Sequence, residues 1–275
     1  MSTTTVNGVQ STLGKLTFGR IVHSEWIKLR TLRSTFWTLA SVVVVIVGFS
    51  VLVSSFMPDA TSTAIPASFR DSIVVAAAAS GISFGHLIIA VLGVIAISGE
   101  FSTGMIRSSF AAEPRRFPVL AAKAITVFIT AFITGLVSLT ISWTIATSAL
   151  STKGYDTSFF SSGTLWSILG GAASLGLIAI FAIGVGAIVK STAAGIATAL
   201  GILFVLPIIG NILVGTLPKE KWISDTMPYL INASSSGMAT LPNGTLEVWQ
   251  NVLSVVIWAA VAFIGGSILT QRRDA

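Results

Sequence analysis

Residues 42–53 read VVVVIVGFSVLV, an apolar run interrupted only by Gly48 and Ser50. The run belongs to the longer stretch Phe36 to Met57, which has the length of about 20 residues that a helix needs to cross the hydrocarbon core of a membrane. Five similar stretches follow: Ile73 to Ser98, Ala122 to Ala149, Leu165 to Val189, Ala193 to Leu217 and Val248 to Thr270. Each must be helical, because lipid offers no partner to a bare backbone N–H or C=O. The sequence therefore predicts an all-α polytopic membrane protein with six spans.

The composition agrees with a membrane protein. Of 275 residues, 53% are hydrophobic and only 9% are charged, whereas about 25% are charged in a soluble domain. The absence of cysteine excludes disulfides, thiolate metal sites and thiol nucleophiles. We find no internal repeat, so residues 1–275 are expected to form a single transmembrane domain. The formal charge of +6 is explained by topology signals, and no nucleic-acid partner is expected.

The distribution of Lys and Arg predicts the orientation. With the N-terminus placed inside, twelve of the sixteen fall on inner segments and four fall on outer ones. This positive-inside bias predicts that both termini are cytoplasmic. The longest outer segment, residues 218–247, contains Trp222 and Tyr229 around a modestly apolar middle. It either dips into the outer interface of the membrane or is a solvated loop.

Residues 15–35 are predicted to form an amphipathic helix before the first span. Its apolar residues recur at steps of three and four, which marks one helical face: Phe18, Val22, Trp26, Leu29, Leu32 and Phe36. Basic residues lie around that face: Lys15, Arg20, Lys28, Arg30 and Arg33. Such a helix lies in the membrane plane against anionic head groups. Glu25 falls close to the apolar face, where it pairs with Lys28 or meets a basic partner surface.

A charged, turn-broken segment joins spans two and three on the predicted cytoplasmic side: residues 99–123 read GEFSTGMIRSSFAAEPRRFPVLAAK. We expect a short helix with Phe101, Met105 and Ile106 near one exposed face and Glu100 and Arg107 at its ends. Apolar side chains rimmed by charge are typical of a docking surface. The alternative is a solvated connector that only holds topology charges.

A second motif lies inside span two, where residues 81–85 read GISFG and His86 follows. The pattern G-x-S-x-G would suggest a nucleophilic serine at Ser83, and so an intramembrane serine hydrolase. The same residues match G-x-x-x-G, by which Gly81 and Gly85 let two membrane helices approach closely, and a mid-span position favours this packing interpretation. His86 is interpreted as a neutral imidazole bonded to a neighbouring backbone or hydroxyl group, with a role in a pathway or gate as the alternative.

Span five contains FVLPIIGNILVG, residues 204–215. Pro207 is expected to bend the helix, because it removes a backbone hydrogen bond. Asn211 either bonds a freed carbonyl, bonds a neighbouring helix or faces a cavity. Phe204, Pro207 and Asn211 are therefore candidate gate residues.

The chain carries no recognisable energy source or metal site. The nearest match to a phosphate-binding P-loop is GVQSTLGK, residues 8–15, which is one residue too long. There is no HExxH motif, His cluster or expected pair of buried carboxylates, so no metal site is predicted. The acidic residues lie outside the span centres, which weighs against an ion-coupled secondary carrier, although backbone carbonyls also bind sodium.

Together these features resemble the permease subunits of type-two, exporter-like ATP-binding-cassette transporters. The resemblance covers nearly the whole chain and is most specific at residues 24–39, SEWIKLRTLRSTFWTL, and 99–123. It implies that residues 99–118 hold a coupling helix seated in a groove of a separate ATPase subunit, with contacts from Glu100, Phe101, Gly104, Met105, Ile106 and Arg107. It also implies that the amphipathic segment is a connecting helix, which touches the ATPase and to which Glu25, Trp26, Lys28 and Arg30 belong.

The resemblance further implies that the chain performs no chemistry and binds no cofactor, since the partner subunit binds ATP. Two permeases, either identical copies or paralogues, would pair with two ATPases and form the path of an amphipathic or apolar substrate between them. The expected location is the plasma (inner) membrane of a bacterium.

Overall fold

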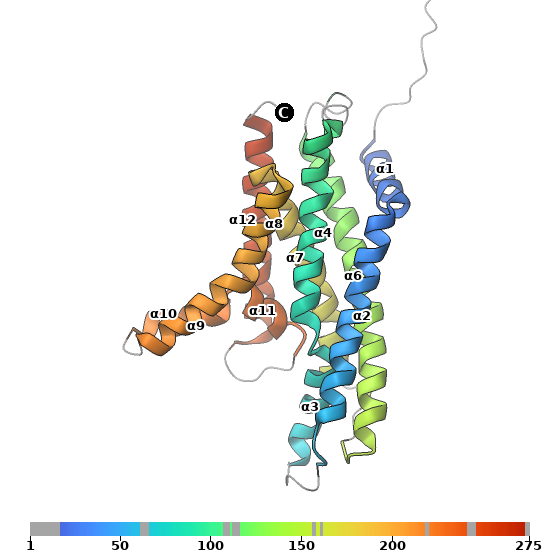
Figure 1. The fold of residues 1–275 in the computed structure, drawn as a ribbon, viewed down its shortest axis with the longest axis vertical. Helices are drawn as coiled ribbons and strands as arrows, with labels where there is room; N and C mark the ends of the chain where they lie inside the picture. The colour runs from blue at the N-terminus through green and yellow to red at the C-terminus, as the bar shows by residue number, and fades with distance from the viewer. Residues whose placement is uncertain are drawn as a thin grey trace, which may run out of the picture.

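The computed structural model describes residues 17–60, 66–106, 111, 116–155, 158–159, 162–217, 220–240 and 246–272. Its elements are all helical (Figure 1): α1 Phe18–Thr31, α2 Arg33–Phe56, α3 Ala67–Ala79, α4 Ile82–Thr103, α6 Phe117–Ser151, α7 Ser162–Val189, α8 Thr192–Leu200, the π-helical turn η1 Gly201–Val205, α9 Leu206–Thr216, α10 Lys221–Thr226, the 3₁₀ turn η2 Met227–Tyr229, α11 Ile231–Gly237 and α12 Val248–Arg272. Six helical stretches are long and apolar enough to span a membrane: Arg33–Phe56, Phe69–Thr103, Phe117–Ser151, Gly163–Val189, Thr192–Thr216 and Val248–Arg272. The predicted fold class is confirmed.

Two of the six spans are not single straight helices. The second is divided into α3 and α4 near Gly81, where a Cβ atom would lie 2.6 Å from the Cα of Ile46 on α2. Glycine therefore allows the two backbones to pack against each other. The fifth consists of α8, η1 and α9, and the π-helical turn ends just before Pro207, which has no N–H to donate to the preceding turn. The helix is therefore irregular just before Pro207, as expected where a backbone hydrogen bond is lost.

Helix α7 forms the centre of the bundle and packs against α4, α6 and α12. Its sequence is hydrophobic on all sides, as expected of a helix surrounded by other helices. The contact with α12 is so close that a Cβ atom on Gly184 would lie 2.3 Å from the backbone carbon of Ala262. The core is therefore built from helix backbones in direct contact as well as from interlocked side chains.

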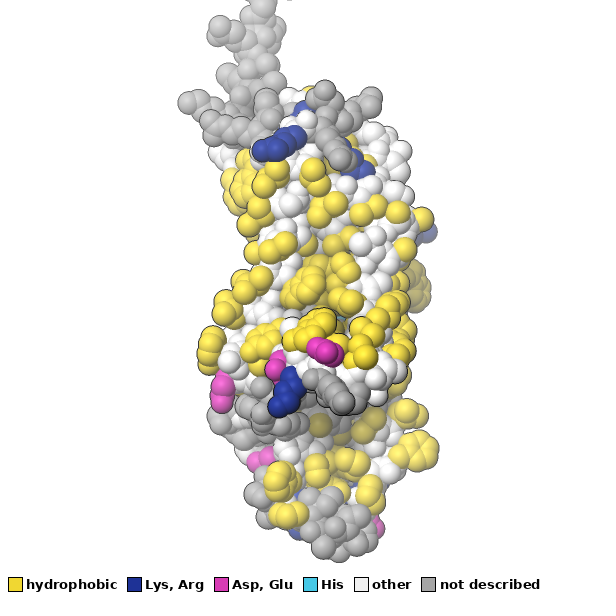
Figure 2. Space-filling model, turned by 90° about the vertical axis from the view of Figure 1, so that its left-hand side faces the viewer, with side chains coloured by type: hydrophobic (Ala, Val, Ile, Leu, Met, Phe, Trp, Pro, Cys, Tyr) yellow, Lys and Arg dark blue, Asp and Glu magenta, His cyan; other side chains and the backbone are white. Residues whose placement is uncertain are grey.

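The span α8–η1–α9 lies at the side of the bundle, and its α9 end projects away from α2 and α6 together with α10 (Figure 1). On the face shown in Figure 2, hydrophobic side chains cover much of the middle of the molecule, and Asp and Glu atoms lie in the lower half. After α10, the chain returns to the bundle as α11, which packs against α12 and α7 and buries Ser234 and Ser235. This packing favours the interpretation in which part of residues 218–247 enters the membrane region.

Helix α1 is separate from the first span because Leu32, between α1 and α2, has an extended backbone (ψ 113°). It packs mainly on α6. We call one end of the bundle the α1 end: here α1, the last turn of α4 and the first turns of α6 meet (Figure 1). The last turn of α12 also belongs to this end, because Arg116 donates a 2.8 Å hydrogen bond to the carbonyl of Thr270.

Candidate functional site

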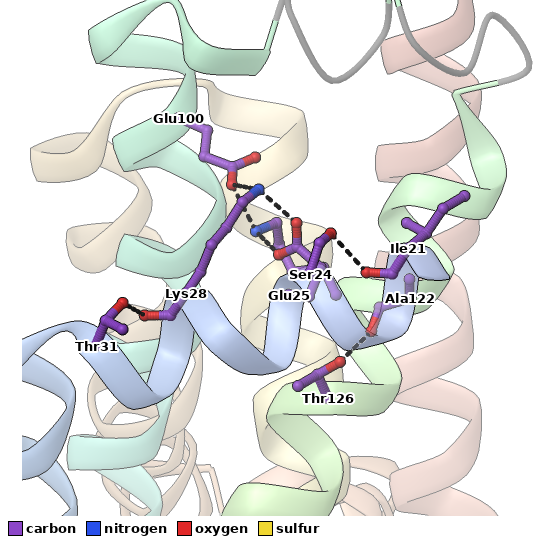
Figure 3. A network of polar contacts seen from close by, with 9 residues as sticks. Ile21, Ser24, Glu25, Lys28, Thr31, Glu100, Ala122 and Thr126 are labelled. Carbon is purple, nitrogen blue, oxygen red and sulfur yellow. Dashed lines mark hydrogen bonds and ion pairs between the residues drawn. The ribbon is translucent and has the colours of Figure 1, made fainter. Parts of the chain in front are cut away.

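Three buried charges and one partly exposed charge form a closed network at the α1 end, called the ion ring: Glu25, Glu100 and Lys123 are buried, and Lys28 is partly exposed. Lys28 Nζ lies 2.5 Å from Glu25 Oε1 and 2.9 Å from Glu100 Oε1. Lys123 Nζ lies 2.5 Å from Glu25 Oε2 and 2.9 Å from the same Glu100 Oε1. Figure 3 shows Glu25 and Lys28 on α1 facing Glu100 on α4. The ring therefore joins α1, α4 and α6. Two of its paired residues, Glu25 and Lys123, lie 98 residues apart in sequence.

The position of each charged residue along its helix explains why its side chain points into the ring. Ile21, Glu25 and Lys28 are spaced by four and three residues, so they share the face of α1 that is turned toward the bundle. Glu100 lies in the last turn of α4, where a negative charge is unfavourable beside the helix C-terminus. Two ammonium groups within 3 Å offset that penalty. The ring therefore stabilises an arrangement that neither helix favours alone.

Most side chains of the ring are shielded from solvent. The side chains of Glu25, Glu100 and Lys123 are only 4–5% exposed, whereas that of Lys28 is 31% exposed. Burial raises the pKa of Glu25, but Lys123 and Lys28 more than offset it, so that the pKa falls below its ordinary 4.5. Burial lowers the pKa of Lys28, but Glu25 and Glu100 outweigh it and the pKa rises above its ordinary 10.5. Both groups of α1 therefore stay charged at neutral pH.

The structure changes the interpretation of the predicted docking face. Glu100, which was predicted to flank the exposed face, is 4% exposed and is turned inward to the ring. Ile106 is 1% exposed, so the prediction that it lies on that face is wrong. The reason is Gly104, which has a left-handed backbone (φ 73°) and ends α4, so that Met105 and Ile106 do not continue its helical spacing. Met105 does lie outside, 44% exposed.

The other residues of this predicted contact divide between the bundle and the surface. Phe101 is partly buried, and its ring lies 5.2 Å from Lys190 Nζ in a cation–π contact. Arg107 lies outside the described residues. On α1, Trp26 and Arg30 are exposed.

His86, at the α4–α7–α11 contact, is fully buried and bonded to hydroxyl groups. Its Nε2 lies 2.8 Å from Ser174 Oγ, and its Nδ1 lies 3.4 Å from Ser235 Oγ. Ser83 instead bonds Ser236, with 3.1 Å between their Oγ atoms. Neither of these His86 bonds goes to Ser83, so the structure does not pair the predicted candidate nucleophile with His86 as its base. Gly85 packs close to the side chain of Ile46, as Gly81 packs on its backbone.

Two of the three candidate gate residues of span five are exposed, and Pro207 is partly buried. Phe204 is exposed, and Asn211 is also exposed and donates a 2.8 Å hydrogen bond to the carbonyl of Pro207 on its own helix. Asn211 therefore bonds a local carbonyl, one of the alternatives expected, and contacts no neighbouring helix through that bond.

The role of Lys123 and the pairing of two buried carboxylates were not predicted from the sequence. A signal was present, because a glutamate in the last turn of an apolar helix and a lysine within the next apolar run each need a partner of opposite charge. Within the described part of the chain, no group of three or more His, Cys, Asp or Glu side chains could hold a metal ion.

The described chain is thus a multi-pass, all-helical membrane protein with an ion network at one end of the bundle. No protein-family model matches it, and no curated protein matches it either.

Proposed function

We propose that the chain is the membrane-spanning permease subunit of an ATP-driven exporter, moved by a separate ATPase subunit that binds at the α1 end. The ion ring is the observation that carries this proposal. It joins α1 to the ends of α4 and α6, so a displacement of α1 moves both helices. Because α4 packs along the central helix α7, that movement passes into the core of the bundle.

The proposed ATPase contact is narrower than the one expected from sequence. It consists of exposed groups beside the ring: Met105 and Ser102 near the end of α4, and Trp26 and Arg30 on α1. Glu100 and Ile106 act from within, where they hold the end of α4 in place. Apolar side chains with a polar and cationic edge, here Ser102 and Arg30, are typical of a protein–protein contact.

The proposal includes a second copy of the chain or a paralogue. Phe204, Ile208 and Ile212 recur every four residues and are all exposed, so they give α9 and the turn before it one apolar side. We place the partner permease there and the substrate path between the two, with apolar walls that suit an amphipathic or apolar substrate. The excess of Lys and Arg supports a cytoplasmic location for the α1 end, in the plasma membrane of a bacterium.

The contact is tested by co-purification from native membranes. We expect the tagged wild-type chain to recover a subunit with ATPase activity and a P-loop sequence. The double variant Met105→Asp, Ser102→Arg should lose it while remaining folded, since both side chains are exposed. Ser224→Arg, an exposed change on α10, is the matched control and should recover the wild-type amount. Equal recovery with the double variant would contradict the proposed contact.

The motor is tested by reconstitution. In liposomes without the ATPase the chain should move no solute, and adding the ATPase with ATP should start transport. Sustained pumping by the chain alone would overturn the proposal.

A further inference from the structure

A pocket of about 210 Å³ lies where α1 and α2 meet, beside α6. Its walls are mainly apolar and are formed by Trp26, Leu29, Phe36 and Leu39. Because α1 is amphipathic and α2 begins the first span, we place the pocket at the level where lipid head groups meet their hydrocarbon chains. The pocket is smaller than most small-molecule sites, which exceed about 300 Å³, so it holds only part of a larger ligand.

Arg30 gives this pocket a positive charge. Among the described residues that line the pocket, it is the one with a charged side chain. That side chain forms no hydrogen bond or ion pair with another described residue. Glu25, on the same helix, is already paired with Lys28 and Lys123 in the ion ring. The charge of Arg30 is therefore not balanced within the described chain, and a guanidinium is suited to binding phosphate oxygens through two parallel N–H groups.

Thr35 adds a second polar group to the pocket. It is 4% exposed, and its hydroxyl has no hydrogen-bond partner among the described residues. The hydroxyls of Thr31 and Thr38 each donate to the carbonyl four residues earlier. For Thr35 that carbonyl belongs to Thr31, on the other side of the extended residue Leu32, and this bond is not made. Buried hydroxyls without a partner are rare in proteins, and a ligand oxygen would satisfy this one.

A strip of exposed apolar side chains leads from the pocket along α6. Ile133, Val137 and Ile141 follow the pocket residue Thr130 at steps of three and four, so they share its side of the helix. Their exposed fractions are 48%, 48% and 39%. A hydrocarbon chain that leaves the pocket would therefore find an apolar surface toward the middle of the span.

We propose that this pocket binds one anionic phospholipid of the bilayer, with the phosphate on Arg30 and Thr35 and an acyl chain along α6. A zwitterionic lipid offers the same phosphate, but its ammonium group would bring a second cation close to Arg30. The small volume supports a lipid over a soluble ligand, because most of a lipid stays in the bilayer while its phosphate is bound.

The site does not depend on the proposed permease function, since it uses only residues of one chain. Trp26 and Arg30 are shared with the proposed ATPase contact. The two proposals are therefore tested through different residues: Met105 and Ser102 test the ATPase contact, and pocket residues test the lipid.

Binding is tested on the purified chain in dodecyl maltoside micelles by pull-down of radiolabelled lipid, with protein-free beads subtracted. We expect dioleoylphosphatidylglycerol, which is anionic, to bind saturably at one site per chain. Dioleoylphosphatidylcholine, which has the same chains and is zwitterionic, should bind at least about tenfold more weakly. Equal binding of the two lipids would overturn the proposal.

Two arginine variants distinguish this site from general attraction to a basic surface. Arg30→Gln should lower the phosphatidylglycerol affinity to within about twofold of that for phosphatidylcholine. Arg33→Gln removes an exposed arginine that does not line the pocket, and should change the affinity by less than about threefold. Equal losses in the two variants would assign the binding to the whole basic surface and overturn the site.

A second pair of variants locates the acyl chain. Leu39→Trp fills the pocket without changing a charge and should lower phosphatidylglycerol affinity at least about tenfold. Val44→Trp makes the same kind of change at an exposed position of α2 outside the pocket lining, and should bind as the wild type does. Wild-type affinity in Leu39→Trp would overturn the site. If Leu39→Trp folds poorly, Arg30→Gln, which changes an exposed side chain, still decides.

A soluble phosphate ester is the alternative ligand. A large molar excess of glycerol 3-phosphate should leave phosphatidylglycerol binding unchanged, because the ester has no chain for the apolar walls. Displacement of phosphatidylglycerol by this ester would overturn the assignment to a lipid.

Discussion

Replacing Lys123 by methionine is expected to destabilise the α1 end strongly, because the substitution removes a buried cation from the ion ring. The intact ring holds two carboxylates and two ammonium groups, so its net charge is zero. Without Lys123, two buried carboxylates share only Lys28, and Glu25 Oε2 loses the partner that lay 2.5 Å away. Removing one partner of a buried ion pair costs roughly 3–5 kcal/mol.

A compensating substitution separates this charge effect from simple loss of packing. In Lys123→Met, Glu25→Gln, the remaining charges are Lys28 and Glu100, which neutralise each other at 2.9 Å. The double variant should therefore recover about 2 kcal/mol relative to Lys123→Met, within the range measured for residues that share one network. Lys221→Met, which removes an exposed lysine, should change stability by less than about 0.5 kcal/mol.

The assay is equilibrium unfolding in mixed micelles with increasing dodecyl sulfate, followed by tryptophan fluorescence. Amide hydrogen exchange in α1 provides a local readout, because loss of the ring should release α1 before the core spans open. If Lys123→Met costs less than about 1 kcal/mol and leaves exchange in α1 unchanged, the ring does not hold the three helices together, and the proposed transmission through α1 fails with it.

Three further outcomes follow from the structure. The lowered pKa of Glu25 stabilises the folded state above pH 4.5, and the raised pKa of Lys28 does so below pH 10.5. The stability that this pair contributes, measured as the difference in thermal stability between the wild-type chain and Glu25→Gln, should therefore be level between these values and fall outside them. A change in that difference inside the window would contradict the ring. Gly184→Ala should lower the free energy of unfolding in detergent by about 1–3 kcal/mol, because its Cβ would meet the α12 backbone. The control Gly48→Ala, with open space around it, should be neutral or slightly stabilising. Equal effects of the two substitutions would refute the close contact. Lys153→Met should cost about 1–2 kcal/mol, since this lysine donates to three carbonyl oxygens at the end of α2, and a loss no larger than in the exposed-lysine control would show that water replaces these bonds.

The six spans could be predicted from sequence because each is a local property of length and hydropathy. The irregularity before Pro207 was likewise local, since a missing N–H acts on its own helix. The division of the second span at Gly81 could not be predicted from local sequence, because this glycine packs against Ile46 on a different helix. Sequence showed that Gly81 permits close packing, whereas the partner and the break required the folded chain.

The predicted exposure of Ile106 was wrong because it assumed one continuous helical spacing from Phe101 to Ile106. The left-handed backbone at Gly104 ends that spacing and turns Ile106 inward. Glycine is the commonest residue at such helix ends, so the sequence did contain a stop signal three residues after Phe101. A pattern of apolar residues across a glycine therefore gives weaker support for a shared face than the same pattern without one.

The ion ring also changes the charge argument for orientation. Lys28 and Lys123 are among the twelve inner cations, but each is neutralised by buried carboxylates and adds little to the charge that faces water. Removing both leaves ten cations against four, and the bias still favours a cytoplasmic α1 end. Sequence could require that Glu25 and Glu100 find cations, but not which of twelve would reach them. The choice of Lys123 depends on α1 crossing both α4 and α6, and this crossing exists only in the folded bundle.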